Sequence, residues 1–143
     1  MADQANAWTT LGSAHKASFS FTKLVVDDLE KSAAFYKEVL GLEELMRVDE
    51  AVADRPISEI LFKQTVEGGA TFALFKFLHE SAPAPGEVIL GFVTPDLEAL
   101  LQRATKAGGK IVQPIKSMPQ LGIKVAFVAD VEGRLLEVVQ MLG

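Results

Sequence analysis

The sequence contains no cysteine, and this absence excludes disulfide bonds, thiolate chemistry and sulfur-ligated metal sites. Histidine is almost as scarce, since only His15 and His79 occur. With two histidines so far apart along the chain, no Ser–His–Asp grouping is readable from the sequence. Candidate functional groups must therefore come from other residue types.

Long apolar runs and an excess of positive charge are also missing. No apolar stretch approaches the roughly 20 residues that a membrane-spanning helix requires. The formal net charge is −5, so nucleic acids and anionic membranes are not expected as partners of this chain. Residues 1–18 lack the basic start and apolar run of a signal peptide. We expect them to form a flexible leader of a cytoplasmic protein.

What the sequence does contain is enough apolar material for one domain. It has 143 residues, of which 49% are apolar, and domains most often run to roughly 100–150 residues. We expect a single domain over residues 19–142. Within it, Pro83, Pro85 and Gly86 indicate a linker at residues 79–86, between a first module at 19–78 and a second at 87–142.

The first module has the pattern of one strand, one helix and three further strands. Strands are predicted by runs rich in Phe, Leu, Ile, Val and Thr at Ser20–Val26, Leu42–Val48, Ile57–Lys63 and Ala70–Phe77. Between the first two of these lies a helix, predicted by an apolar stripe at Leu29, Ala33, Tyr36 and Leu40. Gly41 suits the left-handed turn that ends such a helix. The polar stretch Asp49–Pro56 is interpreted as a loop.

The second module repeats this pattern. Strands are predicted at Val88–Val93, Lys110–Gln113, Ile123–Ala129 and Arg134–Met141, and a helix by the stripe Leu97, Leu100, Leu101 and Ala104. Gly108 and Gly109 end the helix, and the segment Pro114–Gly122 is interpreted as a long loop.

A shift of 68 positions superimposes the two modules, because Asp28-Leu29-Glu30 falls on Asp96-Leu97-Glu98 and Gly41 falls on Gly109. We therefore predict an α+β fold with two βαβββ modules. The alternative is an unrelated α+β sheet with two helices, such as a ferredoxin-like domain, which has difficulty placing eight strands.

Two segments resemble a known family. Phe21–Leu45, with FYKEVLGLEE at its centre, and Phe127–Val139, which reads FVADVEGRLLEVV, resemble the opening module and the final hairpin of the vicinal oxygen chelate superfamily. This is the glyoxalase, bleomycin-resistance and extradiol-dioxygenase group. The resemblance implies a curved mixed sheet around a cavity, with the helices on the outside and metal ligands on the concave face. It also implies a homodimer.

The metal positions of that family can be carried over one at a time. They fall on Phe21, near Phe75, on Ile89 and on Glu137. Only Glu137 can ligate a metal, whereas a catalytic divalent ion typically needs about three protein ligands. We therefore expect no metal and no other cofactor.

The cavity implied by the resemblance would be apolar and rich in aromatic side chains. Because side chains alternate across a strand, Lys23 is expected on the same face as Phe21, and Phe77 on the same face as Phe75. Ser58, Ile60 and Phe62 are expected in the cavity wall. The predicted ligand-binding residues are Phe21, Lys23, Phe62, Phe75, Phe77 and Ile89.

Glu137 is the candidate catalytic residue of this cavity. If it pairs with Lys23, both groups stay charged and the pair is structural or polarises a ligand. If it does not, Glu137 can act as a general acid or base. The competing interpretations are a ligand contact and a structural remnant satisfied by the backbone or water.

These observations favour a protein that binds a small, largely apolar or aromatic molecule. One alternative is an enzyme of the same superfamily: a lyase, isomerase or dioxygenase. It would act without a metal through Glu137 and Lys23, or with a metal held by other residues such as His79 or Glu59. The other alternative is an interaction module whose cavity is filled by Phe21, Phe75 and Phe77.

Overall fold

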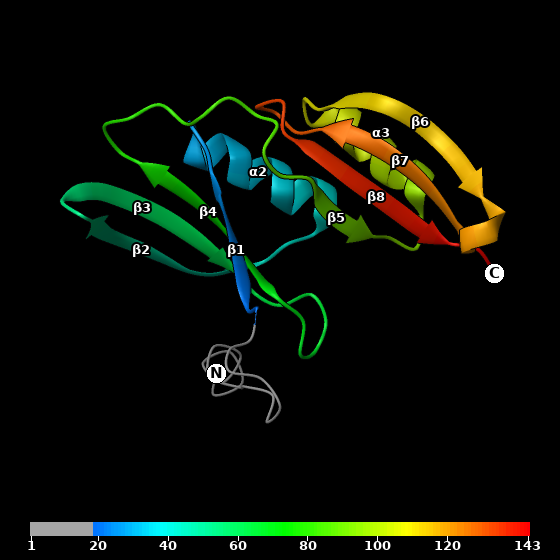
Figure 1. Cartoon of the computed structure of the whole chain (residues 1–143), viewed down its shortest axis with the longest axis horizontal. Helices are drawn as coiled ribbons and strands as arrows, with labels where there is room; N and C mark the ends of the chain where they lie inside the picture. The colour runs from blue at the N-terminus through cyan, green and yellow to red at the C-terminus, as the bar shows by residue number, and fades with distance from the viewer. Residues whose placement is uncertain (1–18) are drawn as a thin grey trace. The chain divides into compact units, whose positions relative to one another are not determined.

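The computed structural model describes residues 19–143, so the predicted leader at residues 1–18 lies outside the described part (Figure 1). The elements follow the predicted order of strand, helix and three strands, twice over. They are β1 (Phe21–Val25), α2 (Leu29–Leu40), β2 (Glu44–Val52), β3 (Arg55–Phe62), β4 (Thr71–Phe77), β5 (Leu90–Val93), α3 (Leu97–Lys106), β6 (Lys110–Met118), the short 3₁₀ helix η1 (Pro119–Leu121), β7 (Ile123–Ala129) and β8 (Leu135–Met141).

The strands form two four-stranded sheets with the same topology, which confirms the α+β fold with two βαβββ modules. The strand orders are β1-β4-β3-β2 and β5-β8-β7-β6. In each sheet the first strand runs parallel to the last strand of its module, and the other pairs are antiparallel. The strands thus lie in two separate sheets, neither of which closes on itself.

The contacts divide the chain into two compact units, each of which contains one sheet. Among the described residues, unit one contains 19–29 and Leu42–Ala82, and unit two contains Glu30–Gly41 and Pro83–Gly143. The boundary between Ala82 and Pro83 falls inside the predicted linker at residues 79–86. Most of α2 groups with unit two, although the sequence places this helix in the first module.

The hairpin of β2 and β3 in unit one is longer than the sequence predicted. Asp49–Pro56 is not a loop, because Asp49 pairs with Ser58 and Val52 pairs with Arg55 across the two strands. The reversal needs only Ala53 and Asp54, both with positive φ angles of 49° and 66°, as expected for a two-residue hairpin turn. The stretch looked like a loop because β2 is an edge strand, and edge strands commonly carry charged, solvent-facing side chains.

One face of the unit one sheet is an apolar core. Alternate residues of β1, β3 and β4 on this face are at most 7% exposed: Leu24, Ile60, Phe62 and Leu74. The Phe62 ring stacks on that of Phe72 with the centroids 5.9 Å apart. The side chains that alternate with these must point to the opposite face of the sheet.

In unit two, α3 packs against the sheet through the predicted stripe of Leu97, Leu100, Leu101 and Ala104, all buried. Asp96 caps the helix, because its carboxylate accepts a hydrogen bond from the Ala99 N–H at 3.0 Å. Gly109 follows the helix at a tight point. A Cβ atom there would lie 2.6 Å from the Ala129 carbonyl oxygen, so no larger residue fits without a shift of the backbone.

The segment predicted as the loop Pro114–Gly122 is mostly strand. β6 continues to Met118 with register shifts on either side of Gln113, and η1 follows it directly. Pro114 is tolerated because β6 is an irregular edge strand, where a missing N–H costs little. Neither α2 nor α3 is long and apolar enough to cross a membrane.

Helix α2 is attached to the turn between β7 and β8 by a buried hydrogen-bond network. The Tyr36 hydroxyl donates to Asp130 Oδ2 at 2.7 Å, and Asp130 Oδ1 accepts the N–H groups of Glu132 and Arg134, each at 2.9 Å. Burial and the adjacent Asp130 carboxylate both raise the pKa of Tyr36, so its hydroxyl stays a donor. Arg103 of α3 donates to the Val39 carbonyl at 3.1 Å.

Candidate functional site

The face of the unit one sheet opposite the core carries most of the predicted ligand-binding residues. Lys23 lies beside Ala73, and Phe75 lies beside Glu59 across neighbouring strands. Alternation along each strand then defines the set, which we call the Lys23 face: Phe21 and Lys23 on β1, Phe75 and Phe77 on β4, and Arg55, Ile57 and Glu59 on β3. The prediction that Lys23 shares a face with Phe21, and Phe77 with Phe75, agrees with this register.

A charged pair lies at the centre of the Lys23 face. The Lys23 ammonium is 3.0 Å from Glu59 Oε1 and 3.1 Å from Oε2. The Glu59 side chain is 8% exposed, whereas that of Lys23 is 32% exposed. A carboxylate so far removed from water requires a charged or hydrogen-bonding partner, and Lys23 supplies it. The charge of Glu59 is therefore neutralised within unit one.

Aromatic rings surround this pair. The Lys23 nitrogen is 5.6 Å from the centre of the Phe21 ring and 5.2 Å from that of Phe75, both within the range of cation–π attraction. The Phe77 ring packs edge-on against Phe75, with the centroids 5.2 Å apart. The face thus combines an apolar aromatic surface with one internally paired cation.

A second cation lies at the other end of the face. The guanidinium carbon of Arg55 is 3.7 Å from the centre of the Phe77 ring. Its Nε and Nη2 atoms donate to the two oxygens of Glu80 at 2.7 and 2.5 Å. This bidentate hydrogen bonding lowers the pKa of Glu80. Both cations of the Lys23 face are therefore paired with carboxylates, and the face carries little net charge.

Phe62 does not belong to this site, and its prediction as a wall residue is wrong. It is 1% exposed and stacks on Phe72, on the core face of the sheet. Ile60 lies there as well, because both residues alternate with Glu59 and Leu61 along β3. The sequence prediction failed because β3 carries large apolar residues on both faces, so its register cannot be read from the segment alone.

Glu137 and Ile89 belong to unit two. Glu137 lies on β8 between Gly91 of β5 and Phe127 of β7, and it is half-buried. Within residues 19–143 its carboxylate forms no hydrogen bond or ion pair. A Cβ atom at Gly91 would meet nothing within 4 Å, so there is open space beside Glu137. Ile89 precedes β5 and is 55% exposed.

The pairing considered for Lys23 and Glu137 is replaced by the pairing of Lys23 with Glu59. From the sequence alone, Glu59 was considered only as a substitute metal ligand. One signal pointed to it, since Glu59 is the only charged residue in the run Ile57–Phe62 and a charge within an apolar strand needs a partner. Lys23, on the edge strand β1 of the same sheet, is the cation that the register supplies.

The strand registers also show which positions correspond between the two sheets. Gly91 pairs with Glu137 as Lys23 pairs with Ala73, so the counterpart of Glu137 in unit one is Ala73. The second metal position, placed near Phe75 from the sequence, thus moves to Ala73 on the same face. Alanine cannot ligate a metal either, so the shift restores no donor.

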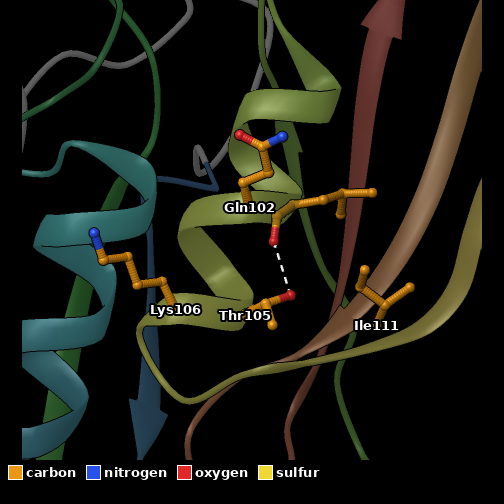
Figure 2. Close-up of a pocket in the computed structure, with 5 residues that line it drawn as sticks. Gln102, Thr105, Lys106 and Ile111 are labelled. Atoms are coloured by element: carbon orange, nitrogen blue, oxygen red, sulfur yellow. Dashed lines mark hydrogen bonds between the residues drawn. The ribbon is translucent and has the colours of Figure 1, made fainter.

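A depression on unit two, shown in Figure 2, is lined by none of these residues. It has a volume of about 370 Å³ and is lined by Leu101, Gln102, Thr105, Lys106 and Ile111. The Thr105 hydroxyl is already used, because it donates to the Leu101 carbonyl at 3.0 Å, and Lys106 extends away from Ile111 (Figure 2). Since polar groups do not converge in this depression, we do not take it as the functional site.

Comparison with known protein families shows which family the chain belongs to. Residues 18–138 match the model of the Glyoxalase/Bleomycin resistance protein/Dioxygenase superfamily. The chain belongs to this superfamily. The resemblance of its opening module and final hairpin is thereby confirmed, and the match extends over both units.

Three similar proteins share 25% or less of their sequence with this chain. A protein from Vibrio parahaemolyticus serotype O3:K6 (strain RIMD 2210633), named probable lactoylglutathione lyase, is 25% identical over 122 residues, which cover 83% of this chain and 87% of the relative. The crystal structure of a glyoxalase family protein from Bacillus cereus has a TM-score of 0.79 at 18% identity, covering 94% of this chain and 100% of that chain. A glyoxylase/bleomycin resistance protein/dioxygenase domain from Frankia sp. EAN1pec has a TM-score of 0.66 at 23% identity, with coverages of 89% and 93%. The two structures support the fold alone.

The side chains of residues 19–143 do not suit the metal centre expected from the superfamily. Among the expected positions, Phe21, Ala73 and Ile89 offer no donor atom, which leaves Glu137. Residues 19–143 hold no group of three or more His, Cys, Asp or Glu side chains that could bind a metal ion. His79, the alternative ligand, lies in an exposed turn after β4. The donor set of these residues therefore does not fit the metal that the superfamily implies.

Proposed function

We propose that this protein binds a small, largely apolar or aromatic molecule on the Lys23 face without using a protein-bound metal. The proposal is supported above all by one observation: two accessible phenylalanine rings, Phe21 and Phe77, lie on the same face as the ion pair of Lys23 with the buried carboxylate of Glu59. Phe21 is 40% exposed, and Phe77 is half-buried. Ligand sites typically combine an apolar aromatic lining with a few fixed polar groups, and the Lys23 face has both.

The rings would supply most of the binding free energy. Burying an aromatic side chain against a planar ligand removes a large apolar area from water, and stacked or edge-on ring pairs add to this. The two cations add orientation rather than net charge, since each is already paired with a carboxylate. A neutral or weakly charged aromatic molecule therefore fits this surface better than a multiply charged one.

A thermal-shift screen with matched variants tests this proposal. Ligands that bind the folded state raise the melting temperature by mass action. We expect at least one aromatic compound to stabilise the wild-type protein, and Phe21→Ala to abolish most of that shift. Phe19→Ala is the control, because Phe19 lies two residues earlier, is 84% exposed and is outside β1. If no aromatic compound stabilises the protein, or if both variants respond as the wild type does, the proposal is wrong.

A second candidate function is catalysis without a metal, in which Glu137 acts as general acid or base. The specific observation in its favour is a half-buried carboxylate without a partner in residues 19–143, beside open space at Gly91. A proton-transferring group must have such direct access to its substrate. The distant relative named probable lactoylglutathione lyase suggests lactoylglutathione as a first compound to test. Glu137→Gln should then abolish turnover and leave binding intact.

Assembly and location are further parts of the proposal. We propose a homodimer, supported by exposed apolar residues on the unit two sheet, such as Val93 at 71% and Met141 at 61%. Light scattering that detects only a 15.4 kDa species would rule the dimer out. We also propose a cytoplasmic protein that binds neither nucleic acid nor membrane, consistent with its net charge of −5.

A further inference from the structure

Lys23 places its ammonium in a box made by three other residues of unit one. Phe21 and Phe75 contribute the aromatic walls, at 5.6 and 5.2 Å from the nitrogen. Glu59 contributes the carboxylate, with both oxygens within 3.1 Å. We call these three residues the cation box. Aromatic rings around a carboxylate are the arrangement that binds organic cations, including quaternary ammonium groups.

The carboxylate of the cation box has acceptor capacity that Lys23 does not use. Glu59 is 6% exposed, so water cannot readily reach it. Its Oε1 atom is buried and accepts no hydrogen bond, although the ammonium is 3.0 Å away, because the angles are unfavourable. Because a buried charged oxygen without a hydrogen bond is unfavourable, the binding of an additional donor or cation in the box would be favourable.

The occupant is less enclosed than the carboxylate and one of the two aromatic walls. Glu59 and Phe75 lie opposite each other on the interior strands β3 and β4, and Phe75 is only 7% exposed. Lys23 instead lies on the edge strand β1, with a side chain that is 32% exposed. Its flexible four-carbon stem lets the ammonium move into water when another cation takes its place beside Glu59.

From this geometry we propose that the cation box binds a positively charged nitrogen of the ligand, an ammonium or quaternary ammonium group, which displaces the Lys23 ammonium. This inference rests on the proposed small-molecule binding on the Lys23 face and specifies the ligand class: an apolar or aromatic body with one cationic nitrogen. Lys23 acts as an internal competitor that keeps Glu59 neutralised when the ligand is absent.

An anionic ligand group is disfavoured at the same place. To reach the Lys23 ammonium it would have to approach the Glu59 carboxylate, which lies about as close to that nitrogen as a hydrogen bond allows. Drawing Lys23 away toward an anion would also leave a buried charge without a partner, which is strongly unfavourable. A cationic ligand group avoids both costs because it replaces one cation by another.

The test uses choline and its uncharged isostere 3,3-dimethylbutan-1-ol on wild-type protein and on Lys23→Met, which removes the competing charge but keeps the length of the side chain. We expect Lys23→Met to bind choline about tenfold more tightly than the wild type does, as measured by calorimetry at constant ionic strength. The isostere should show no such gain. Glu59→Gln added to Lys23→Met should abolish the gain.

The control is Lys76→Met, which removes a lysine from β4 on the opposite face of the same sheet. It should bind choline as the wild type does. An equal gain in Lys76→Met, or no gain in Lys23→Met, overturns the inference. If Lys23→Met does not fold, Lys23→Gln takes its place, and a choline titration of wild-type protein must shift the NMR signals of Phe75 and Glu59. The absence of such shifts at saturating choline overturns the inference as well.

The two proposals fail separately. If uncharged aromatic compounds stabilise the wild-type protein while choline gains nothing from Lys23→Met, the cation box is wrong and binding on the Lys23 face stands. If choline binds Lys23→Met as expected but no compound stabilises the wild-type protein in the thermal-shift screen, the box is real and the proposed function is wrong.

Discussion

The two sheets share one topology but differ in where a charged side chain lies and in whether it has a partner of opposite charge. In unit one, the first strand carries the charge, and Lys23 lies beside the small residue Ala73. In unit two, the last strand carries it, and Glu137 lies beside Gly91. Lys23 has a partner in Glu59, whereas Glu137 has none within residues 19–143. Corresponding pairs of strands therefore carry a neutralised cation in one sheet and a carboxylate without a partner among residues 19–143 in the other.

Buried polar groups differ between the units as well. Unit one neutralises Glu59 with one flexible side chain, which another cation can replace. Unit two satisfies Asp130 with a hydroxyl and two backbone N–H groups, all of which are held by the fold. The difference separates a carboxylate that is available for function from one that is structural. Four substitutions test this distinction.

The largest effect is expected for Asp130→Ala. This residue is 3% exposed, and its loss removes an acceptor of the Tyr36 hydroxyl and of two backbone N–H groups. We expect the free energy of unfolding to fall by about 2–4 kcal/mol, measured by urea denaturation. Glu98→Ala, on the exposed side of α3, should change it little. A loss no greater than that of the control would show that this network is not structural.

Lys23→Met should destabilise the protein less. It leaves Glu59 buried without a partner, at a cost of about 1–3 kcal/mol, and the partial exposure of Lys23 places the effect toward the lower end. Adding Glu59→Leu should recover most of the loss, because an apolar residue replaces the unpaired charge. Urea denaturation of both variants measures this. Equal instability of the single and double variants would contradict the pairing.

Gly91→Lys would make unit two resemble unit one. The new side chain enters open space beside Glu137, where opposite charges on neighbouring strands contribute about 0.2–1 kcal/mol of stability. We expect a small rise in the melting temperature and the loss of any turnover that depends on Glu137. Gly91→Met adds similar bulk without charge and should not raise stability to the same extent. Equal effects of the two variants on stability would show that Glu137 does not interact electrostatically with the introduced lysine.

Glu80→Gln should have the smallest effect, and it should depend on pH. Hydrogen bonds from Arg55 lower the pKa of Glu80 below its ordinary value of 4.5, so the ionised form is favoured in the folded state. Its contribution to stability is complete above pH 4.5 and disappears as the pH falls through the lowered folded-state pKa. Wild-type and variant melting temperatures should therefore differ slightly at neutral pH and converge in acid. If the two melting temperatures instead diverge as the pH falls, the ionised form of Glu80 does not stabilise the folded state.

Several strands were predictable because their residues follow the expected periods, but their ends were not. The stretch Asp49–Pro56 is polar and ends in proline, which locally favours a loop, yet the pairing with Arg55–Phe62 extends β2 to Val52. Pro114 likewise favoured a loop after Gln113, whereas β6 continues through it to Met118. In both cases hydrogen bonding to a distant segment outweighed local preference. Such pairing is not visible in the strand itself.

The candidate site was predictable only in part, for a related reason. Alternation placed Lys23 on the same face as Phe21 and Phe77 on the same face as Phe75, in agreement with the register, because each pair lies on one strand. Phe62 was placed on the wrong face of the sheet. Large apolar residues occur on both faces of β3, so its sequence does not show which side chains point to which face. Glu59 was not recognised as the partner of Lys23, because 36 residues separate them in the sequence.

By itself, the sequence determined the two βαβββ modules and the superfamily, because these follow from periodicity and motif. Only the tertiary structure decided that Lys23 neutralises Glu59 and that the strand neighbour of Glu137 on β5 is Gly91, which has no side chain. Partnership between charges depends on strand register, and register is determined by hydrogen bonds between segments that are remote in the sequence.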